Sequence, residues 1–248
     1  MSGLDWLTAR PVAHRGLHDA GAGVIENTPT AFAAAAAANY AIECDLQISA
    51  DGEAMVHHDG ALGRLTDGSG RLDELTSAEL RRVAFKATTD RMISVGELCD
   101  LVAGRVTLVI ELKSDRTGDR RLAARAAAVL SGYAGPAAVM SFDPAQIAPL
   151  RTSAPLLTRG IVAEGGSGHL DREQALARGK RAFAYGRDVL RAHPQFIAYS
   201  VKDLPAALPL AARHLYAMPL LTWTVRSKEE RQRAARWADQ MIFEGFRP

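Results

Sequence analysis

Short apolar runs alternate with longer alanine-rich stretches along most of the chain. The short runs are typical of buried parallel strands, and the longer stretches are typical of the helices that connect them. The pattern never reverses into a series of strand-only hairpins, which favours a sheet closed into a barrel over an open sheet. We therefore predict an α/β fold, a (β/α)8 TIM barrel, with strands at 11–14, 40–48, 106–113, 137–142, 159–162, 196–201, 220–225 and 240–245.

The first predicted helix has sequence signals at both of its ends. Thr28 has a hydroxyl that can accept a bond from the first turn, and Pro29 suits the first helical position because it lacks an N–H group. Asn39 tolerates the left-handed conformation in which helices often end. Residues 73–80 and 120–130 are also predicted to be helical.

One connection is much longer than the others. Between the second and third barrel strands lie nearly sixty residues, with a predicted hairpin that turns at Asp51 and Gly52 and a glycine-rich polar segment at 62–74. Connections of this length in a compact barrel are usually functional, as lids or substrate-binding segments. Since no internal repeat or linker is found, we predict a single domain over residues 1–248 with an insertion at about 60–94.

Composition and charge limit the classes of function. The chain has 248 residues, close to the roughly 250 of one such barrel, and no stretch approaches the roughly 20 apolar residues that cross a bilayer. Its net charge is +2, with arginines interspersed among acidic residues, so nothing indicates nucleic-acid binding or stable membrane insertion. The N-terminus lacks the apolar run of a secretory signal, and Cys44 and Cys99 have no metal-type spacing. We therefore expect a cytoplasmic protein, and the oligomeric state stays open.

Two acidic residues share one face of the second predicted strand. Alternate side chains of a strand point the same way, so Glu43 and Asp45 face one side and Cys44 faces the other. Like charges this close are unfavourable unless a cation or a shared proton lies between them, and Mg²⁺ and Ca²⁺ take carboxylate oxygens. The pair is therefore a candidate metal site, and the alternative is a pair of solvated residues at a strand end.

Glu111 and Lys113 repeat this arrangement on the next long strand. Two charges on one face of an otherwise apolar strand need partners, because a buried unpaired charge is costly. Glu111 would supply a third carboxylate to the same site, and Lys113 would supply a cation for an anionic substrate. The alternative is a simple ion pair that caps the barrel.

Histidines end the first strand and the predicted hairpin. His14 and Arg15 lie where barrel enzymes place catalytic groups. Arg15 has the planar guanidinium that suits phosphate oxygens, and His14 titrates near neutral pH, as a general acid or base should. The structural alternative for His14 is a hydrogen-bonded residue without a chemical role. Of the neighbours His57 and His58, only one is expected to reach the site, because adjacent strand residues point to opposite faces.

Together these motifs resemble those of the glycerophosphodiester phosphodiesterase family, in its bacterial, cytoplasmic type. The segments AHRG, ENTPTAF, IECDLQISADGEAMVHHD, LGRLTDGSG, VIELKS, SFDP and LTWTV follow in the family's order across almost the whole chain. The resemblance implies a barrel whose insertion after the second strand covers the active site, and one divalent cation, Mg²⁺ or Ca²⁺. It also implies metal ligands at Glu43, Asp45 and Glu111, catalytic histidines at His14 and His58, phosphate contacts at Arg15 and Lys113, and further substrate-site residues at Glu26, Asn27 and Trp223.

The activity that the resemblance implies is metal-dependent hydrolysis of glycerophosphodiesters to glycerol 3-phosphate and an alcohol. One histidine would act as base and the other as acid, and the substrate's own glycerol hydroxyl would attack to give a cyclic phosphate that water then opens. A lysophospholipase D or phospholipase-type activity on the same barrel is the alternative, and the lack of an amphipathic or strongly apolar surface segment argues against it. A catalytically degenerate protein that binds a phosphate ligand is a second alternative, although no expected ligand or histidine is missing.

The C-terminal segment departs from the family pattern. Family members usually have a threonine-aspartate pair before a final proline, whereas this chain has Phe243 and Glu244 there. We expect the change to affect local contacts of the eighth strand and substrate preference, and to touch none of the residues assigned to chemistry. The preferred head group and the choice between Mg²⁺ and Ca²⁺ stay open.

Overall fold

The computed structural model describes residues 3–165, 186–187 and 189–248 and contains a closed barrel of eight parallel strands. The first barrel strand, β1, pairs with both β2 and β9, which closes the ring, and a ninth strand, β3, pairs antiparallel with β2. The predicted (β/α)8 TIM barrel is confirmed. The barrel strands are β1 (Val12–Ala13), β2 (Ala41–Ile48), β4 (Leu108–Leu112), β5 (Ala137–Ser141), β6 (Thr158–Ala163), β7 (Phe196–Ser200), β8 (Leu220–Val225) and β9 (Gln240–Phe243), and the hairpin strand is β3 (Ala54–Val56).

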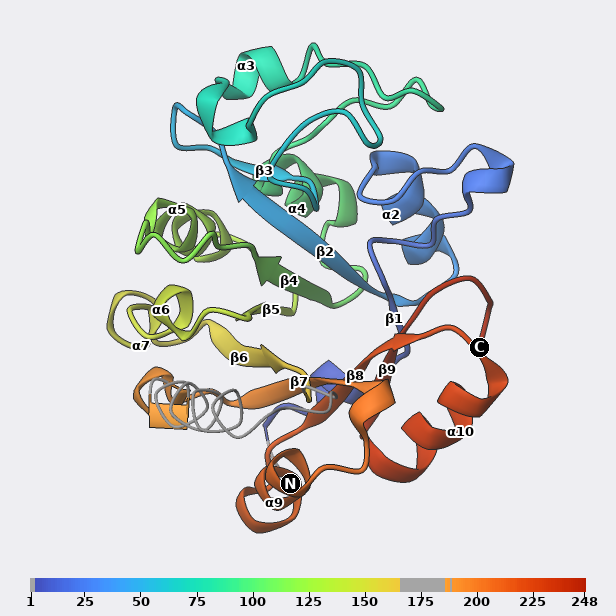
Figure 1. Cartoon of the computed structure of the whole chain (residues 1–248), viewed down its shortest axis with the longest axis vertical. Helices are drawn as coiled ribbons and strands as arrows, with labels where there is room; N and C mark the ends of the chain where they lie inside the picture. Colours follow the sequence, from blue (N-terminus) through green and yellow to red (C-terminus); the bar gives the residue numbers. More distant parts are fainter. Residues whose placement is uncertain (1–2, 166–185, 188) are drawn as a thin grey trace, which may run out of the picture.

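Helices lie around the outside of the strands (Figure 1). The first predicted helix is confirmed: the Thr28 side chain accepts a bond from the N–H of Ala31, Pro29 is in the first turn, and Asn39 has a φ of 63°. The helix predicted at 120–130 also forms. The α-helices are α1 (Asp5–Thr8), α2 (Pro29–Ala37), α3 (Ser77–Leu80), α4 (Val95–Val102), α5 (Arg121–Leu130), α6 (Pro144–Ile147), α7 (Leu150–Ser153), α9 (Ala207–Tyr216) and α10 (Lys228–Trp237), with 3₁₀ turns η1 (Ala20–Ala22), η2 (Leu72–Glu74) and η3 (Val201–Asp203).

The prediction of one helix over residues 73–80 is wrong. The chain forms the 3₁₀ turn η2 and then the short helix α3, and Leu75 and Thr76 between them are extended. Thr76 is the N-cap of α3 and forms a capping box with Glu79. The 3₁₀ turn ends at Leu75, and Thr76 has the non-helical backbone angles of an N-cap residue, so no continuous helix can run from 73 to 80.

Side chains of the barrel strands alternate between two apolar layers. On β4, Val109 packs inside the barrel, whereas Ile110 packs outward against the helices. On β2, Ala41 lies inside, and Ile42 and Cys44 lie in the outer layer. Since the faces alternate with a period of two, the acidic residues of both strands continue the inner face towards the carboxyl ends.

The segment that follows β3 packs on a small apolar core of its own. Its core residues are Ile25, Met55, Leu72, Leu80, Phe85 and Met92. Asp51, in the turn between β2 and β3, accepts bonds from the backbone N–H and the hydroxyl of Ser77, which tethers α3 to the barrel. In the described ranges, no helix combines the length and the apolar character that crossing a membrane requires.

Candidate active site

Three carboxylates meet inside the carboxyl end of the barrel. Glu43 and Asp45 come from β2 and Glu111 from β4, and the two strands pair with Asp45 opposite Glu111. All three are buried, and each has an oxygen within 4.8 Å of the others. Neighbouring parallel strands with acidic residues on the same face therefore bring together the three carboxylates that the sequence suggests.

The charges of these carboxylates perturb one another. Burial and the charges of Asp45 and Glu111 raise the pKa of Glu43 well above its usual range. Burial, together with Asp45 and against the cation of Lys113, raises the pKa of Glu111 to about 6. Burial alone would also raise the pKa of Asp45, but the cations of Lys113 and Arg15 outweigh it and hold the pKa below its usual range. The cluster thus has more negative charge than its surroundings stabilise.

Arg15 and Lys113 are the cations next to this cluster. Lys113 Nζ lies 2.8 Å from Asp45 Oδ1 and 2.7 Å from Glu111 Oε1, and Arg15 Nε lies 3.2 Å from Asp45 Oδ2. Two cations against three carboxylates leave one negative charge. A set of buried oxygen donors with an excess negative charge fits a hard divalent cation, so the residues present fit the predicted metal. With it bound, the group would carry one net positive charge, which complements a singly charged phosphodiester.

His14 is held by a residue for which we predicted no such role. Its Nδ1 lies 2.7 Å from Glu244 Oε2, and its Nε2 lies 3.9 Å from Glu43 Oε2. The expectation that the Phe243 and Glu244 departure touches none of the residues assigned to chemistry is therefore wrong. Glu244 follows β9, which pairs with β1, so the closure of the barrel brings together two residues from opposite ends of the sequence. The hydrogen bond from His14 lowers the pKa of Glu244 to about 2.

The two neighbouring histidines after β3 differ in environment. His57 is buried, its Nδ1 lies 2.9 Å from the carbonyl oxygen of Asp59, and burial lowers its pKa. The His58 side chain is 32% exposed and lies with its Nδ1 2.7 Å from Asp59 Oδ1. Of these two histidines, only His58 lines the pocket that Glu43 and Glu111 also line. The structure thus places one histidine of the pair in the site and the other in the protein interior, although both residues lie just after β3 and not in it.

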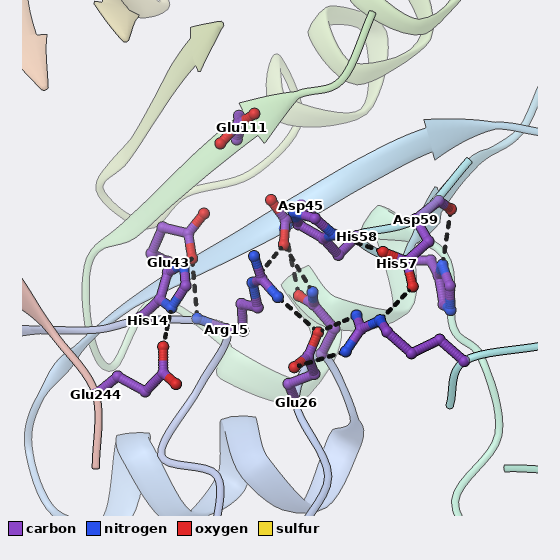
Figure 2. A network of polar contacts seen from close by, with 12 residues as sticks. His14, Arg15, Glu26, Glu43, Asp45, His57, His58, Asp59, Glu111 and Glu244 are labelled. Carbon is purple, nitrogen blue, oxygen red and sulfur yellow. Dashed lines mark hydrogen bonds and ion pairs between the residues drawn. The ribbon is translucent and has the colours of Figure 1, made fainter. Parts of the chain in front are cut away.

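Glu26 and Asn27 lie in a layer behind the pocket. Asn27 Nδ2 donates to Asp45 Oδ2 at 2.8 Å, and Glu26 Oε1 accepts from Arg15 Nη1 at 2.7 Å. Figure 2 shows Glu26 and Arg15 between the two histidine sides of this polar network. Neither Glu26 nor Asn27 is among the residues that line the pocket, so the structure places both where they hold other site residues.

Sequence reasoning also missed Arg64. Its Nε lies 2.6 Å from Asp59 Oδ2 and its Nη2 lies 2.6 Å from Glu26 Oε1. Arg64 belongs to the glycine-rich segment after β3, and its spacing from Glu26 in the sequence gives no indication of this contact. The only signal was the position of LGRLTDGSG among the motifs of the resemblance.

The pocket has a volume of about 200 Å³. Trp223 and Phe142, which both line it, make an edge-to-face contact with ring centroids 5.4 Å apart. These two rings, with Met140, Val162 and Ile242, give the pocket an apolar part beside its charged residues. The lining residues are His14, Arg15, Glu43, His58, Glu111, Lys113, Met140, Phe142, Val162, Trp223, Thr224, Arg226 and Ile242.

Curated proteins of related sequence share a name that describes one reaction. The chain is 43% identical over 74 residues to glycerophosphodiester phosphodiesterase 1 of Bos taurus, a match that covers 29% of this chain and only 21% of the bovine protein. It is 28% identical over 210 residues to the Mycobacterium tuberculosis protein named "Probable glycerophosphodiester phosphodiesterase 1", with 75% of each chain covered.

Solved structures show the same fold, and a family model covers nearly the whole chain. A phosphodiesterase of Oleispira antarctica, in complex with the product sn-glycerol-3-phosphate, has a TM-score of 0.76 and 17% identity over 96% of this chain and 94% of that one. The model of the Glycerophosphoryl diester phosphodiesterase family matches residues 14–246. The chain therefore belongs to the glycerophosphoryl diester phosphodiesterase family, within the enzyme class of the phosphoric diester hydrolases.

Proposed function

We propose that this protein hydrolyses glycerophosphodiesters to glycerol 3-phosphate and an alcohol, with one divalent cation, Mg²⁺ or Ca²⁺, as cofactor. One observation carries the proposal. His14 and His58, each with a carboxylate on its Nδ1, line a single pocket together with Glu43, Glu111 and Lys113. Such a pocket offers two proton-transfer groups beside a site for an anion.

Anion binding is the first requirement of the reaction. Glu43, Asp45 and Glu111 would hold the cation, which would supply Lewis-acid stabilisation of the charge that gathers on the phosphate oxygens. Arg15 and Lys113 lie beside the carboxylates and would contact the same oxygens. Each such contact is worth on the order of a few kcal/mol in the transition state.

Proton transfer is the second requirement. An ionised carboxylate on Nδ1 keeps the Nδ1 proton in place, so the Nε2 atom of each histidine is the one that exchanges protons. His14 and His58 would therefore act as a base and an acid, each contributing about 10²- to 10⁴-fold. The base removes a proton from the glycerol hydroxyl that attacks the phosphorus. The acid protonates the oxygen of the alcohol as the P–O bond breaks, and water then opens the cyclic phosphate.

The remaining residues have supporting roles in this proposal. Asn27 and Glu26 position Asp45 and Arg15, to which they are hydrogen-bonded, and Trp223 forms an apolar wall for the glycerol or the alcohol. The protein would be a single barrel domain in which the insertion at about 60–94 contributes to substrate recognition. Arg64 supports the last point, because it links this insertion to Glu26 and Asp59.

The test is the release of glycerol 3-phosphate from a panel of substrates in the presence of Mg²⁺, Ca²⁺ or a chelator. We expect turnover of glycerophosphocholine, glycerophosphoethanolamine or glycerophosphoglycerol that stops on chelation and returns with a divalent cation. Preferred turnover of a lysophospholipid would instead favour the phospholipase-type activity. Full activity in thoroughly chelated protein would exclude the proposed metal dependence.

A further inference from the structure

A second group of metal-type ligands lies on the far side of His14 from the carboxylate cluster. His14, His18 and Glu244 each offer one nitrogen or oxygen atom, and these atoms lie within 4.8 Å of one another. His18 and Glu244 line a separate cleft of about 510 Å³, which gives an ion a route from solvent. The proposed reaction has no role for His18.

Local backbone geometry brings the three residues together. His14 ends β1, Glu244 follows the paired strand β9, and His18 lies beyond a tight turn at Gly16, which has a φ of 81°. A Cβ at Gly16 would lie 2.9 Å from the backbone of Ala31, so this position requires glycine. The turn thus brings His18 back to the end of the barrel where His14 and Glu244 meet.

The donor set differs in kind from the carboxylate cluster. Two imidazoles and one carboxylate are typical ligands of Zn²⁺ and similar transition metals, whereas an all-oxygen set suits Mg²⁺ or Ca²⁺. The Nε2 atom of His18 is buried and has no hydrogen-bond partner among the described residues. Ligands of a tetrahedral zinc ion lie roughly 3.4 Å apart for bonds of about 2.0–2.1 Å, so small side-chain rotations suffice to bring the three atoms onto one ion.

We propose that His14, His18 and Glu244 form a second, inhibitory site for a transition-metal ion such as Zn²⁺. Occupation requires Arg226, whose Nη2 lies 2.9 Å from Glu244 Oε2, to turn away, and its side chain is 50% exposed. The Glu244 carboxylate then binds the ion and gives up its hydrogen bonds with His14 and Arg226.

Inhibition follows from the chemistry of His14. When Nδ1 donates to Glu244, the lone pair of the neutral ring is on Nε2, which lines the pocket side near Glu43. An ion on Nδ1 needs the Nδ1 lone pair, so the ring proton moves to Nε2 and the ring can no longer accept a proton there. This consequence rests on the proposed function, but the binding of the ion does not.

The experiment measures Zn²⁺ binding calorimetrically, and Co²⁺ binding by its visible absorption, with the whole chain in a large excess of Mg²⁺ that occupies the carboxylate site. The variants are His18→Gln and His18→Ala, with His214→Ala as control, because His214 is an exposed histidine of α9. Wild type should bind one further ion. His18→Gln should bind it at least about 10- to 100-fold more weakly, since even the outer partners of metal ligands have effects of that size, and His214→Ala should behave like wild type.

Activity is measured in the same titrations. Wild type should lose most of its turnover over the Zn²⁺ range in which the second ion binds, whereas the His18 variants should keep theirs. Equal Zn²⁺ affinity in wild type and in a folded His18 variant, checked by circular dichroism, would overturn the proposal, and so would the absence of a second bound ion in wild type. If Zn²⁺ binding depends on His18 but no diester is cleaved, the second site stands and the proposed function fails.

Discussion

The two sides of the pocket contain the same three groups, built from different parts of the chain. On one side His14 bonds Glu244, which pairs with Arg226, and on the other His58 bonds Asp59, which pairs with Arg64. Both histidine–carboxylate distances are 2.7 Å. Figure 2 shows Glu244 beside His14 and Asp59 beside His58, towards opposite ends of the network. The two sides thus have the same types of side chain, but different parts of the fold hold these side chains in place.

The supports differ in rigidity. The His14 side chain is 12% exposed. His14 directly follows β1 and Glu244 directly follows β9, and the pairing of these two strands fixes the backbone next to both residues. The His58 side chain is 32% exposed and lies in a loop whose partner, Arg64, belongs to the insertion. A group anchored by barrel strands is more precisely held than one anchored by loops. The His58 side should therefore respond to changes in the insertion, and the His14 side should not.

The largest expected effect comes from Asp45, which lies between the two sides. Its Asn substitution removes a proposed metal ligand and the partner of Arg15 and Lys113. A metal contact worth several kcal/mol corresponds to about 10³-fold or more in rate, so Asp45→Asn should lower kcat/KM by at least that factor. Cys44→Ala is the matched control, because Cys44 is the neighbour that points into the outer layer.

A second measurement separates binding from catalysis in these variants. A ligand that binds only the folded state raises the melting temperature. Mg²⁺ should therefore raise the melting temperature of wild type and of Cys44→Ala, but not of Asp45→Asn. A normal Mg²⁺ response in Asp45→Asn would contradict the assignment of this residue as a ligand.

The next largest effect separates His58 from His57. Removal of an acid–base group should lower kcat by about 10²-fold or more, so we expect a loss of this size in His58→Ala. His57→Ala should keep most of its kcat and lose stability instead, because His57 is buried away from the pocket. A crippled His57→Ala beside a nearly normal His58→Ala would show that the proposed roles are reversed.

The leaving group then distinguishes acid from base across the pocket. Burial lowers the pKa of His14, which favours the neutral ring that a base needs, so we propose His14 as the base and His58 as the acid. A p-nitrophenyl diester has a good leaving group that needs little protonation. With this substrate the cost of His58→Ala should shrink, whereas the cost of His14→Ala should persist. The opposite pattern would assign the acid to His14.

The barrel and the carboxylate cluster are predictable from sequence because both depend on local periodicity. Apolar runs mark every barrel strand, and alternation places Glu43 and Asp45 on one face whatever the rest of the fold does. Likewise, alternation alone predicted that only one of His57 and His58 would reach the site. It was the family resemblance that selected His58.

The contacts between distant segments could not be predicted in this way. The bond between His14 and Glu244 joins residues 230 positions apart and depends on how β9 pairs with β1. Arg64 reaches Glu26 because the segment after β3 packs against the residues that precede α2, and the spacing of the two residues along the sequence gives no sign of this contact. Side chains in loops do not alternate between two faces as strand side chains do. Their contact partners therefore cannot be predicted from spacing and become known only from the structure.

Glu244→Gln is expected to have an intermediate effect. The amide can donate a hydrogen bond to Nδ1, which favours the wrong tautomer of His14. Partners that orient a histidine in a site are worth about 10- to 100-fold in activity, so kcat should fall within this range in Zn²⁺-free buffer. Glu244→Asp, which keeps the acceptor, should recover part of the loss. Equal losses in both variants would indicate that Glu244 acts through packing rather than through the tautomer.

Arg64→Ala should have the smallest effect and tests the difference in support most directly. Arg64 joins Asp59 and Glu26, but its side chain is 46% exposed, and exposed ion pairs contribute only about 0–1 kcal/mol. The loss in kcat should therefore stay below about 10-fold, since tenfold corresponds to about 1.4 kcal/mol. It should also shrink at high salt, because salt already weakens the wild-type pair. Arg71→Ala is the control, since the Arg71 side chain is 51% exposed in the same segment but pairs with Asp73 outside the catalytic pocket. If both variants lose the same activity, the insertion acts as a whole, and the His58 side does not depend on Arg64 in particular.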